Sequence, residues 1–219
     1  MNWIAYIFFF CVGIKSFSQN ALILGDSHLV GDFGENLHKE IHNLKMFDVL
    51  SIAIGGAGSY HFVQPLKNFC CGYKVRESCI NEVFGKNQKI RIIEAVPDGE
   101  KKNILKGFSS STGKILEAYR PSHIFIVLGS NYINAHQELI QLIRNHTPSA
   151  KIYWIAPFNR LGFDKRIRLI EYVTKNESNT YVIRTDDAFG NDTIKTYHYC
   201  CQMSKNWASL VMERIRPKL

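Results

Sequence analysis

The sequence predicts an α/β fold, a three-layer α/β/α sandwich around a mostly parallel sheet of five strands. Short apolar runs alternate along the chain with segments whose apolar residues recur at helical spacing. Strands that are apolar on both sides are typical of parallel sheets covered by helices on both faces. The 219 residues suffice for one domain with a sizeable core, and 46% hydrophobic and 21% charged residues exclude a largely disordered chain.

Five apolar runs are predicted to be the strands. The first is followed by Gly25, the second by Gly55, the third by Gly129 and the fourth by Pro157, and these residues end extended runs. The predicted strands are Ala21–Leu24, Val49–Ile54, Ile124–Leu128, Lys151–Ala156 and Tyr181–Ile183.

The segments between these runs are predicted to be amphipathic helices. Phe33, Leu37 and Ile41 share one face of the first, and Pro121 ends the second. The predicted helices are Phe33–Asn43, Ser110–Tyr119, His136–Asn145, Asp164–Lys175 and Trp207–Ile215.

Residues 1–19 are expected to be a secretory signal peptide. Trp3 to Ile14 is an almost unbroken apolar run, shorter than the roughly 20 residues that cross a bilayer, and small and polar residues follow it. No lysine or arginine precedes the run, so a buried N-terminal helix is the alternative. We expect cleavage near Ser18 or Gln19, a secreted or periplasmic protein, and no stable membrane insertion.

The chain is basic, with 27 Lys and Arg against 19 Asp and Glu and a formal net charge of +8. A basic exported protein suits an anionic envelope or polysaccharide surface as partner. No basic run with interleaved aromatic residues is present, so no nucleic-acid partner is expected. The alternative is a protein that is basic without a charged partner.

The single domain predicted over residues 20–219 contains an inserted segment at about 60–109. This segment carries a strand-like run at Lys89–Ala95 and a turn at Pro97-Asp98-Gly99. It follows the second strand at the carboxyl edge of the sheet, where ligands of open α/β sheets bind. The insertion is therefore a candidate substrate-recognition lid, or a structural flap.

Five of the six cysteines lie beyond the predicted signal peptide, and export favours disulfides among them. Cys70 or Cys71 paired with Cys79 would close a small loop, whereas the sequence fixes no other pairing. No Cys-x-x-Cys pair is present, which leaves zinc a weak alternative. We therefore predict no metal site and no cofactor.

Four separated features follow predicted strands and are expected to converge at the carboxyl edge of the sheet. Ser27 follows the first strand, Gly58 the second, Asn131 the third and His198 the last. Ser27 is the candidate nucleophile and His198 the candidate base that takes its proton. The backbone N–H groups of Ser27 and Gly58, with the side-chain amide of Asn131, would form an oxyanion hole.

Each of these residues also has a simpler interpretation. Ser27 could cap the helix after the first strand, and Asn131 could cap the next helix. The turn at Gly55–Gly58 could be a phosphate cradle, and His198 a packed loop histidine.

Taken together, the blocks resemble those of the SGNH (GDSL-type) hydrolases over residues 21–215. The resemblance implies a flavodoxin-like three-layer fold and ester hydrolysis or acyl transfer. The matching residues are Gly25-Asp26-Ser27-His28, then Gly55 and Gly58, then Gly129 and Asn131, and finally His198 before Trp207-Ala208.

The chain departs from the pattern of this family at three positions. Ala53 stands where the family usually has Asn, Tyr132 where Asp often follows the Asn, and Lys195 where the triad Asp is expected. A lysine cannot orient His198, and losing the third triad member costs on the order of 10⁴ in kcat. Asp192, six residues before His198, is the favoured replacement; the others are Asp186, Asp187 or a backbone carbonyl.

The sequence thus predicts an exported serine esterase, with an O-acetyl group on a carbohydrate or cell-envelope polymer as the favoured substrate. The family also includes lipases and thioesterases, but no long apolar lid argues for a lipid. One alternative, motivated by Lys195, is a carbohydrate-binding module that has lost turnover. Another is a nucleotide binder using Gly55–Ser59, against which export argues. The sequence does not determine the oligomeric state.

Overall fold

The computed structural model describes residues 19–219 apart from 86–87, 101, 107–109, 158–163 and 186–199. Residues 1–18 of the predicted signal peptide lie outside the described residues, and its last residue, Gln19, is the first residue of the first strand. None of the helices in the described part has both the length and the apolar character needed to cross a bilayer.

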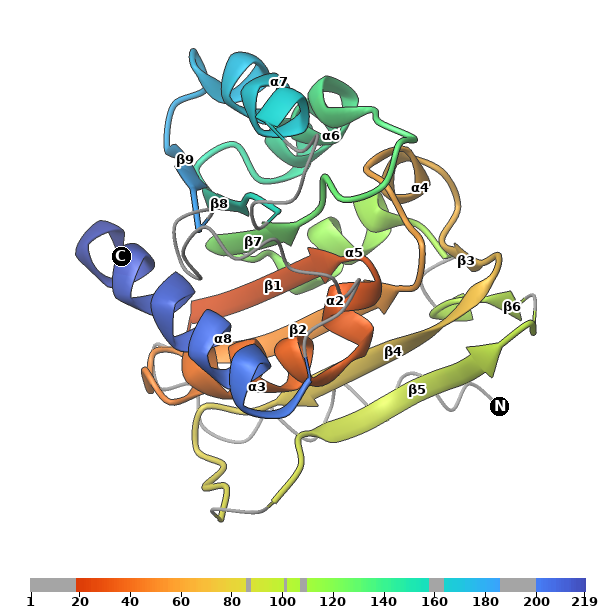
Figure 1. The fold of residues 1–219 in the computed structure, drawn as a ribbon, viewed down its shortest axis with the longest axis vertical. Helices are drawn as coiled ribbons and strands as arrows, with labels where there is room; N and C mark the ends of the chain where they lie inside the picture. Colours follow the sequence, from red (N-terminus) through yellow and green to blue (C-terminus); the bar gives the residue numbers. More distant parts are fainter. Residues whose placement is uncertain (1–18, 86–87, 101, 107–109, 158–163, 186–199) are drawn as a thin grey trace.

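The centre of the fold is a seven-stranded sheet in the order β5-β4-β2-β1-β7-β8-β9 (Figure 1). Five neighbouring strands, from β2 to β9 in that order, are parallel, as the sequence predicts. The seven strands are β1 (Gln19–Gly25), β2 (Phe47–Ile54), β4 (Cys71–Ser78), β5 (Arg91–Asp98), β7 (His123–Val127), β8 (Lys151–Ile155) and β9 (Thr180–Ile183).

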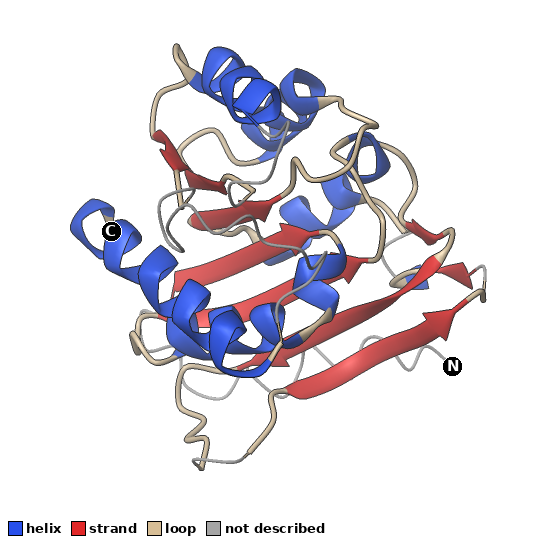
Figure 2. Ribbon diagram, in the orientation of Figure 1, coloured by secondary structure: helices blue, strands red, loops and turns tan. Residues whose placement is uncertain are grey.

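Helices cover both faces of the sheet, which confirms the predicted three-layer α/β/α architecture (Figure 2). Alternate residues of β1 point to opposite faces, so Leu22 and Leu24 join one core and Ala21 and Ile23 the other. The first core includes residues of α4 (Tyr60–Val63), α5 (Thr112–Tyr119), α6 (His136–His146) and α7 (Asp164–Thr174). The second core includes residues of α3 (Asp32–His42) and α8 (Cys201–Ile215), beside the short α2 (Ser27–Val30).

The prediction of five strands is wrong in number, because the inserted segment adds two strands to the sheet. β4 pairs antiparallel with β2, and β5 pairs antiparallel with β4. The strand-like run at 89–95 is therefore an edge strand of the main sheet. A shorter pair, β3 (Lys67–Asn68) and β6 (Lys102–Asn103), lies in the same insertion. Part of the insertion therefore extends the sheet, since β4 and β5 continue the hydrogen-bond ladder of β2.

The last helix also differs from its prediction. α8 begins at Cys201, six residues before the predicted start at Trp207. Residues 201–206 are exposed apart from the buried Ser204, so the buried apolar face begins only at Trp207 and Ala208.

Candidate active site

The turn after β1 requires a glycine. Gly25 pairs with Ala53 of β2 and Val127 of β7, so it lies between two strands at the carboxyl edge. A Cβ on Gly25 would lie 2.4 Å from Leu29 Cδ1 and 2.9 Å from the Val127 carbonyl oxygen. Only a residue without a side chain lets the chain pass from the strand into α2, which begins at Ser27.

Asp26 is the N-cap of α2, so the interpretation of Ser27 as the cap is wrong. The Oδ1 atom of Asp26 accepts the backbone N–H of His28 at 3.0 Å. The carboxyl group is fully buried, and this burial raises its pKa to about 7, although backbone hydrogen bonds oppose the shift. Ser27 is therefore left at the first helical position, half-buried, with its hydroxyl not used as a cap.

The far end of α2 is held by Arg76 of β4. Its guanidinium donates to the carbonyl oxygens of Leu29 at 2.7 Å and Val30 at 3.0 Å. Its Nε lies 3.3 Å from a Glu35 carboxylate oxygen. Only 2% of Arg76 is exposed, and a buried charge needs compensation. The Glu35 carboxylate and the carbonyl oxygens at the end of α2 provide it. Sequence reasoning missed Arg76, since nothing in the insertion indicates which strand it joins.

The turn after β2 is packed too closely for side chains. A Cβ on Gly55 would lie 2.2 Å from the Cys71 carbonyl oxygen, and one on Gly58 would lie 2.0 Å from the Ile133 carbonyl oxygen. Gly56 between them has φ of +74°, which also favours glycine. The glycines thus bring this turn against the loop that follows β7.

The backbone N–H of Gly58 has an acceptor within its own turn. It donates to Nδ1 of His61 at 3.0 Å, and the His61 ring stacks on Phe69 with centroids 4.2 Å apart. Burial lowers the pKa of His61, which keeps the ring neutral and able to accept at neutral pH. Sequence reasoning missed His61 because it lies on α4, beyond the glycine turn.

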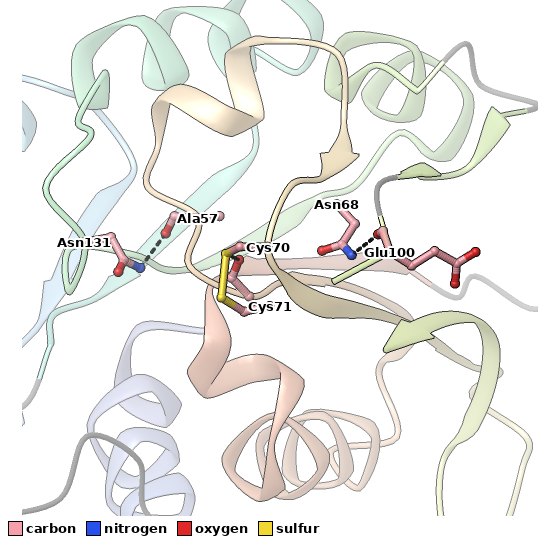
Figure 3. The surroundings of a disulfide bond; sticks show 7 residues. Ala57, Asn68, Cys70, Cys71, Glu100 and Asn131 are labelled. Carbon is pink, nitrogen blue, oxygen red and sulfur yellow. Dashed lines mark hydrogen bonds between the residues drawn. A yellow bond between two sulfur atoms is a disulfide. The ribbon is translucent and has the colours of Figure 1, made fainter. Parts of the chain in front are cut away.

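Cys70 pairs with its neighbour Cys71, so the predicted pairing of either with Cys79 is wrong (Figure 3). The sulfur of Cys70 lies 3.5 Å from the Gly55 carbonyl oxygen. A Cβ on Gly56 would lie 2.9 Å from the same sulfur. The vicinal pair therefore packs against the glycine turn. In the part of the chain that the structure describes, no group of three or more His, Cys, Asp or Glu side chains could hold a metal ion.

Asn131 joins the turns after three strands. Its Nδ2 donates to the Ala57 carbonyl oxygen at 2.8 Å, as Figure 3 shows, and to Oδ2 of Asp26 at 3.3 Å. The N-cap of α6 is Ala135, without a side-chain cap, so Asn131 does not cap that helix. The structure thus brings the turns of Ser27, Gly58 and Asn131 together at one edge of the sheet.

Ser59 provides a second link between the turns after β2 and β7. Its fully buried hydroxyl oxygen accepts the N–H of Ala135 at 2.7 Å and lies 2.8 Å from Nδ1 of His136. The hydroxyl group therefore links the backbone of Ala135 to the imidazole ring of His136. Burial lowers the pKa of His136 to about 4, so the ring is neutral at neutral pH.

The turn after β7 ends in an exposed aromatic ring. Tyr132 is 87% exposed, and the guanidinium of Arg166 on α7 lies 4.0 Å from its ring centroid. The same guanidinium donates to the carbonyl oxygens of Gly129 and Ser130. Tyr132 stands where an Asp often follows the Asn in the SGNH hydrolases, and Arg166 covers one face of its ring.

The predicted acid–base end of the site, with Asp192, Lys195 and His198, lies outside the described residues. The structure describes the chain again from Cys200 onward. The N–H of Cys201 donates to Oδ2 of Asp32 at 2.9 Å, and Trp207 packs edge-on against His28 with ring centroids 5.4 Å apart. The start of α8 therefore lies beside α2 and α3.

Comparisons with known proteins identify the fold. No family profile and no curated protein sequence matches the chain. Among solved structures, the chain is similar to a family 3 carbohydrate esterase from Clostridium thermocellum, with a TM-score of 0.55 and 12% identity over 91% of this chain and 96% of that one. The chain has an SGNH-type hydrolase fold.

Two further structures support this conclusion. A protein described as a GDSL-like lipase from Bacteroides ovatus matches with a TM-score of 0.50 and 14% identity, over 92% of this chain and 100% of that one. A peptidoglycan O-acetylesterase matches with a TM-score of 0.53 and 12% identity, over 91% of both chains. At these identities the SGNH-type fold is shared, whereas activity must be argued from the site.

Proposed function

We propose that this chain is an exported serine esterase that removes an acyl group, most readily an O-acetyl group, from a carbohydrate or cell-envelope polymer. The observation that carries the proposal is the bridge from Asp26 through Asn131 to Ala57. This bridge gathers three turns of the SGNH-type fold around the start of α2, where Ser27 lies.

In the proposed reaction the hydroxyl of Ser27 attacks the ester carbonyl while His198 takes its proton. The negative charge that develops on the carbonyl oxygen is stabilised by the N–H groups of Ser27 and Gly58 and by the Asn131 amide. His198 then gives its proton to the leaving sugar hydroxyl, which frees the alcohol and leaves an acyl-serine. Water, activated by His198, hydrolyses this intermediate; a second sugar hydroxyl in its place would give acyl transfer.

Two of the proposed donors must change partners during this reaction. The Gly58 N–H donates to His61, and the Asn131 amide donates to Ala57 and Asp26. An oxyanion is a stronger acceptor than a neutral carbonyl or imidazole, so it can replace His61 or Ala57 as the charge develops.

The position of Cys201 supports His198 as the base. Cys201 is hydrogen-bonded to Asp32, which directly follows Gly31 at the end of α2. Three residues of chain span at most about 10 Å, so a base at position 198 is within chain reach of the helix that begins at Ser27. Asp192 is the proposed partner of the second ring nitrogen, in place of the acid that Lys195 displaces.

The substrate class rests on charge, export and the structural neighbours. The net charge of +8 favours an anionic envelope or polysaccharide surface. Two of the similar structures are named for esters of carbohydrate and peptidoglycan. These properties do not distinguish a polysaccharide substrate from a peptidoglycan substrate.

The experiment is hydrolysis of a small aryl acetate by the exported protein and its variants. Ser27→Ala and His198→Ala should each lower kcat by at least about 10³-fold, because each removes a member of the catalytic pair. Ser178→Ala, an exposed serine between α7 and β9, is the matched control and should leave the rate unchanged. Equal rates for wild type and Ser27→Ala would contradict the proposal.

A binding module without turnover is the second candidate. It is favoured by the internal partners of Gly58 and Asn131, and by Lys195 at the acid's position. It predicts that the wild type and every variant hydrolyse the ester no faster than the uncatalysed reaction. A burst of acyl-enzyme that is absent in Ser27→Ala would exclude it.

A further inference from the structure

The turn that carries Asn131 also presents a rigid aromatic face. Tyr132 is the next residue, so its Cα lies about 3.8 Å from that of Asn131. With 87% of its surface exposed, it is the most exposed of the large hydrophobic residues in the described chain. The exposed ring is available for contact with a ligand, and its place next to Asn131 puts it at the candidate site.

Arg166 holds this ring in place. Its guanidinium lies 4.0 Å from the ring centroid, and it also donates to the backbone carbonyls of Gly129 and Ser130. One partner therefore binds both the ring and the turn from which the ring projects. A side chain that is already ordered loses little conformational entropy when a ligand packs against it.

The surroundings of the ring are largely polar, and they connect directly to the candidate oxyanion hole. Ile133, 54% exposed, follows the tyrosine. Its carbonyl oxygen packs so closely against Gly58 that a Cβ there would lie 2.0 Å from it. Arg166 covers one face of the ring, and Asn131 precedes the tyrosine in the chain. A ligand bound here needs a flat apolar face and a polar rim. A pyranose ring fits this description, because its C–H groups form faces and its hydroxyls point outward.

We propose that Tyr132 is the platform on which the sugar ring bearing the ester stacks. This inference rests on the proposed function, since it gives the esterase site a carbohydrate rather than a lipid substrate. The ring would pack on Tyr132 while its acyl group points toward Asn131, one residue away. Tyr132 is then a specificity-determining residue with no part in proton transfer.

Tyr172 offers a matched control within the same molecule. It is also exposed, at 66%, and it also carries a cation over its ring, with Lys175 Nζ 4.4 Å from the centroid. It lies near the end of α7 and contacts none of the three turns in the hydrogen bonds and ring contacts of the described residues.

Binding tests the platform without any need for turnover. In the Ser27→Ala protein, a partially O-acetylated xylo-oligosaccharide is titrated by calorimetry. Adding Tyr132→Ala should weaken the Kd about tenfold, Tyr132→Phe should restore it, and Tyr172→Ala should leave it unchanged. The platform is contradicted if Tyr132→Ala binds as the Ser27→Ala protein does, or if Phe is as poor as Ala.

Kinetics of the active protein separate this inference from the proposed function. Tyr132→Ala should lower kcat/KM for the oligosaccharide about tenfold more than for ethyl acetate, which has no ring, and the loss should fall on KM. An equal loss on both esters would show a structural role and overturn the platform. Absence of all Ser27-dependent hydrolysis would refute the proposed function, whereas the titration would still decide on the platform.

Discussion

The turn after β1 and the turn after β2 reach the same edge of the sheet by different means. Charged groups hold the first: buried Asp26 caps α2 at one end, and buried Arg76 binds the carbonyls at the other. Close packing of backbone holds the second, with Gly58 against the Ile133 carbonyl and a single neutral hydroxyl, that of Ser59, tying it to α6.

This difference separates two requirements of the proposed chemistry. A nucleophile must be fixed in direction, and hydrogen bonds at both ends of a four-residue helix do this. An oxyanion donor must let a substrate approach the backbone, and glycines allow it. The first turn should therefore respond to loss of charge and to pH, and the second to added volume.

Apart from loss of the proposed catalytic pair, the largest effect is expected from adding one methyl group to the second turn. In Gly58→Ala the new Cβ would lie 2.0 Å from the Ile133 carbonyl oxygen, so the turn must move and its N–H with it. We expect kcat to fall by about 10²–10³-fold, as when an oxyanion donor is removed. Gly85→Ala, whose Cβ would meet nothing closer than 3.9 Å, is the control. Wild-type kcat in Gly58→Ala would show that this turn does not form the hole.

Removing charge from the first turn should have the next largest effect. Arg76→Met leaves the carbonyls of Leu29 and Val30 without their donors, and we expect the free energy of unfolding to fall by about 2–3 kcal/mol. Lys114→Met is the control, because its ion pair with Glu117 is exposed on both sides and is worth at most about 1 kcal/mol. Urea unfolding measures both, and equal losses would contradict the special role of Arg76.

Ser59→Ala should have a smaller effect, confined to the link between the second turn and α6. The N–H of Ala135 and Nδ1 of His136 both lose their partner inside the core, at a cost of about 1–2 kcal/mol in the free energy of unfolding. Ser111→Ala removes a serine at the start of α5 that makes no capping bond, and it should change little. If the two variants are equally stable, the Ser59 link does not stabilise the fold.

The remaining effect is a pH dependence that belongs to Asp26. Its pKa is raised to about 7 in the folded protein and lies near 3.8 in the unfolded chain. Between these values the folded state binds a proton that the unfolded state has lost, so stability should fall as pH rises from about 4 to about 7. Thermal unfolding of Asp26→Asn should lack this slope, whereas Glu213→Gln, exposed on α8, should retain it. A wild-type slope in Asp26→Asn would assign it to other groups.

The sequence by itself determined the parallel part of the fold and the turns of the candidate site. Five apolar runs, each too hydrophobic to face water on either side, require helices on both faces. Their order then places Ser27, Gly58 and Asn131 after successive strands, and parallel strands end at one edge. These are consequences of local pattern, which a single chain displays without knowledge of its contacts.

Only the tertiary structure decided what holds those turns. The insertion has mixed polarity, and its strands gain their place from pairing with β2, which no local pattern reveals. Arg76, Ser59 and Arg166 act through partners 46, 76 and 36 residues away in the chain. The cap went to Asp26 and not to Ser27, because backbone direction at the end of β1 sets which side chain reaches the helix N–H. Contacts between distant residues depend on packing of the whole chain, and this is why they had to be seen.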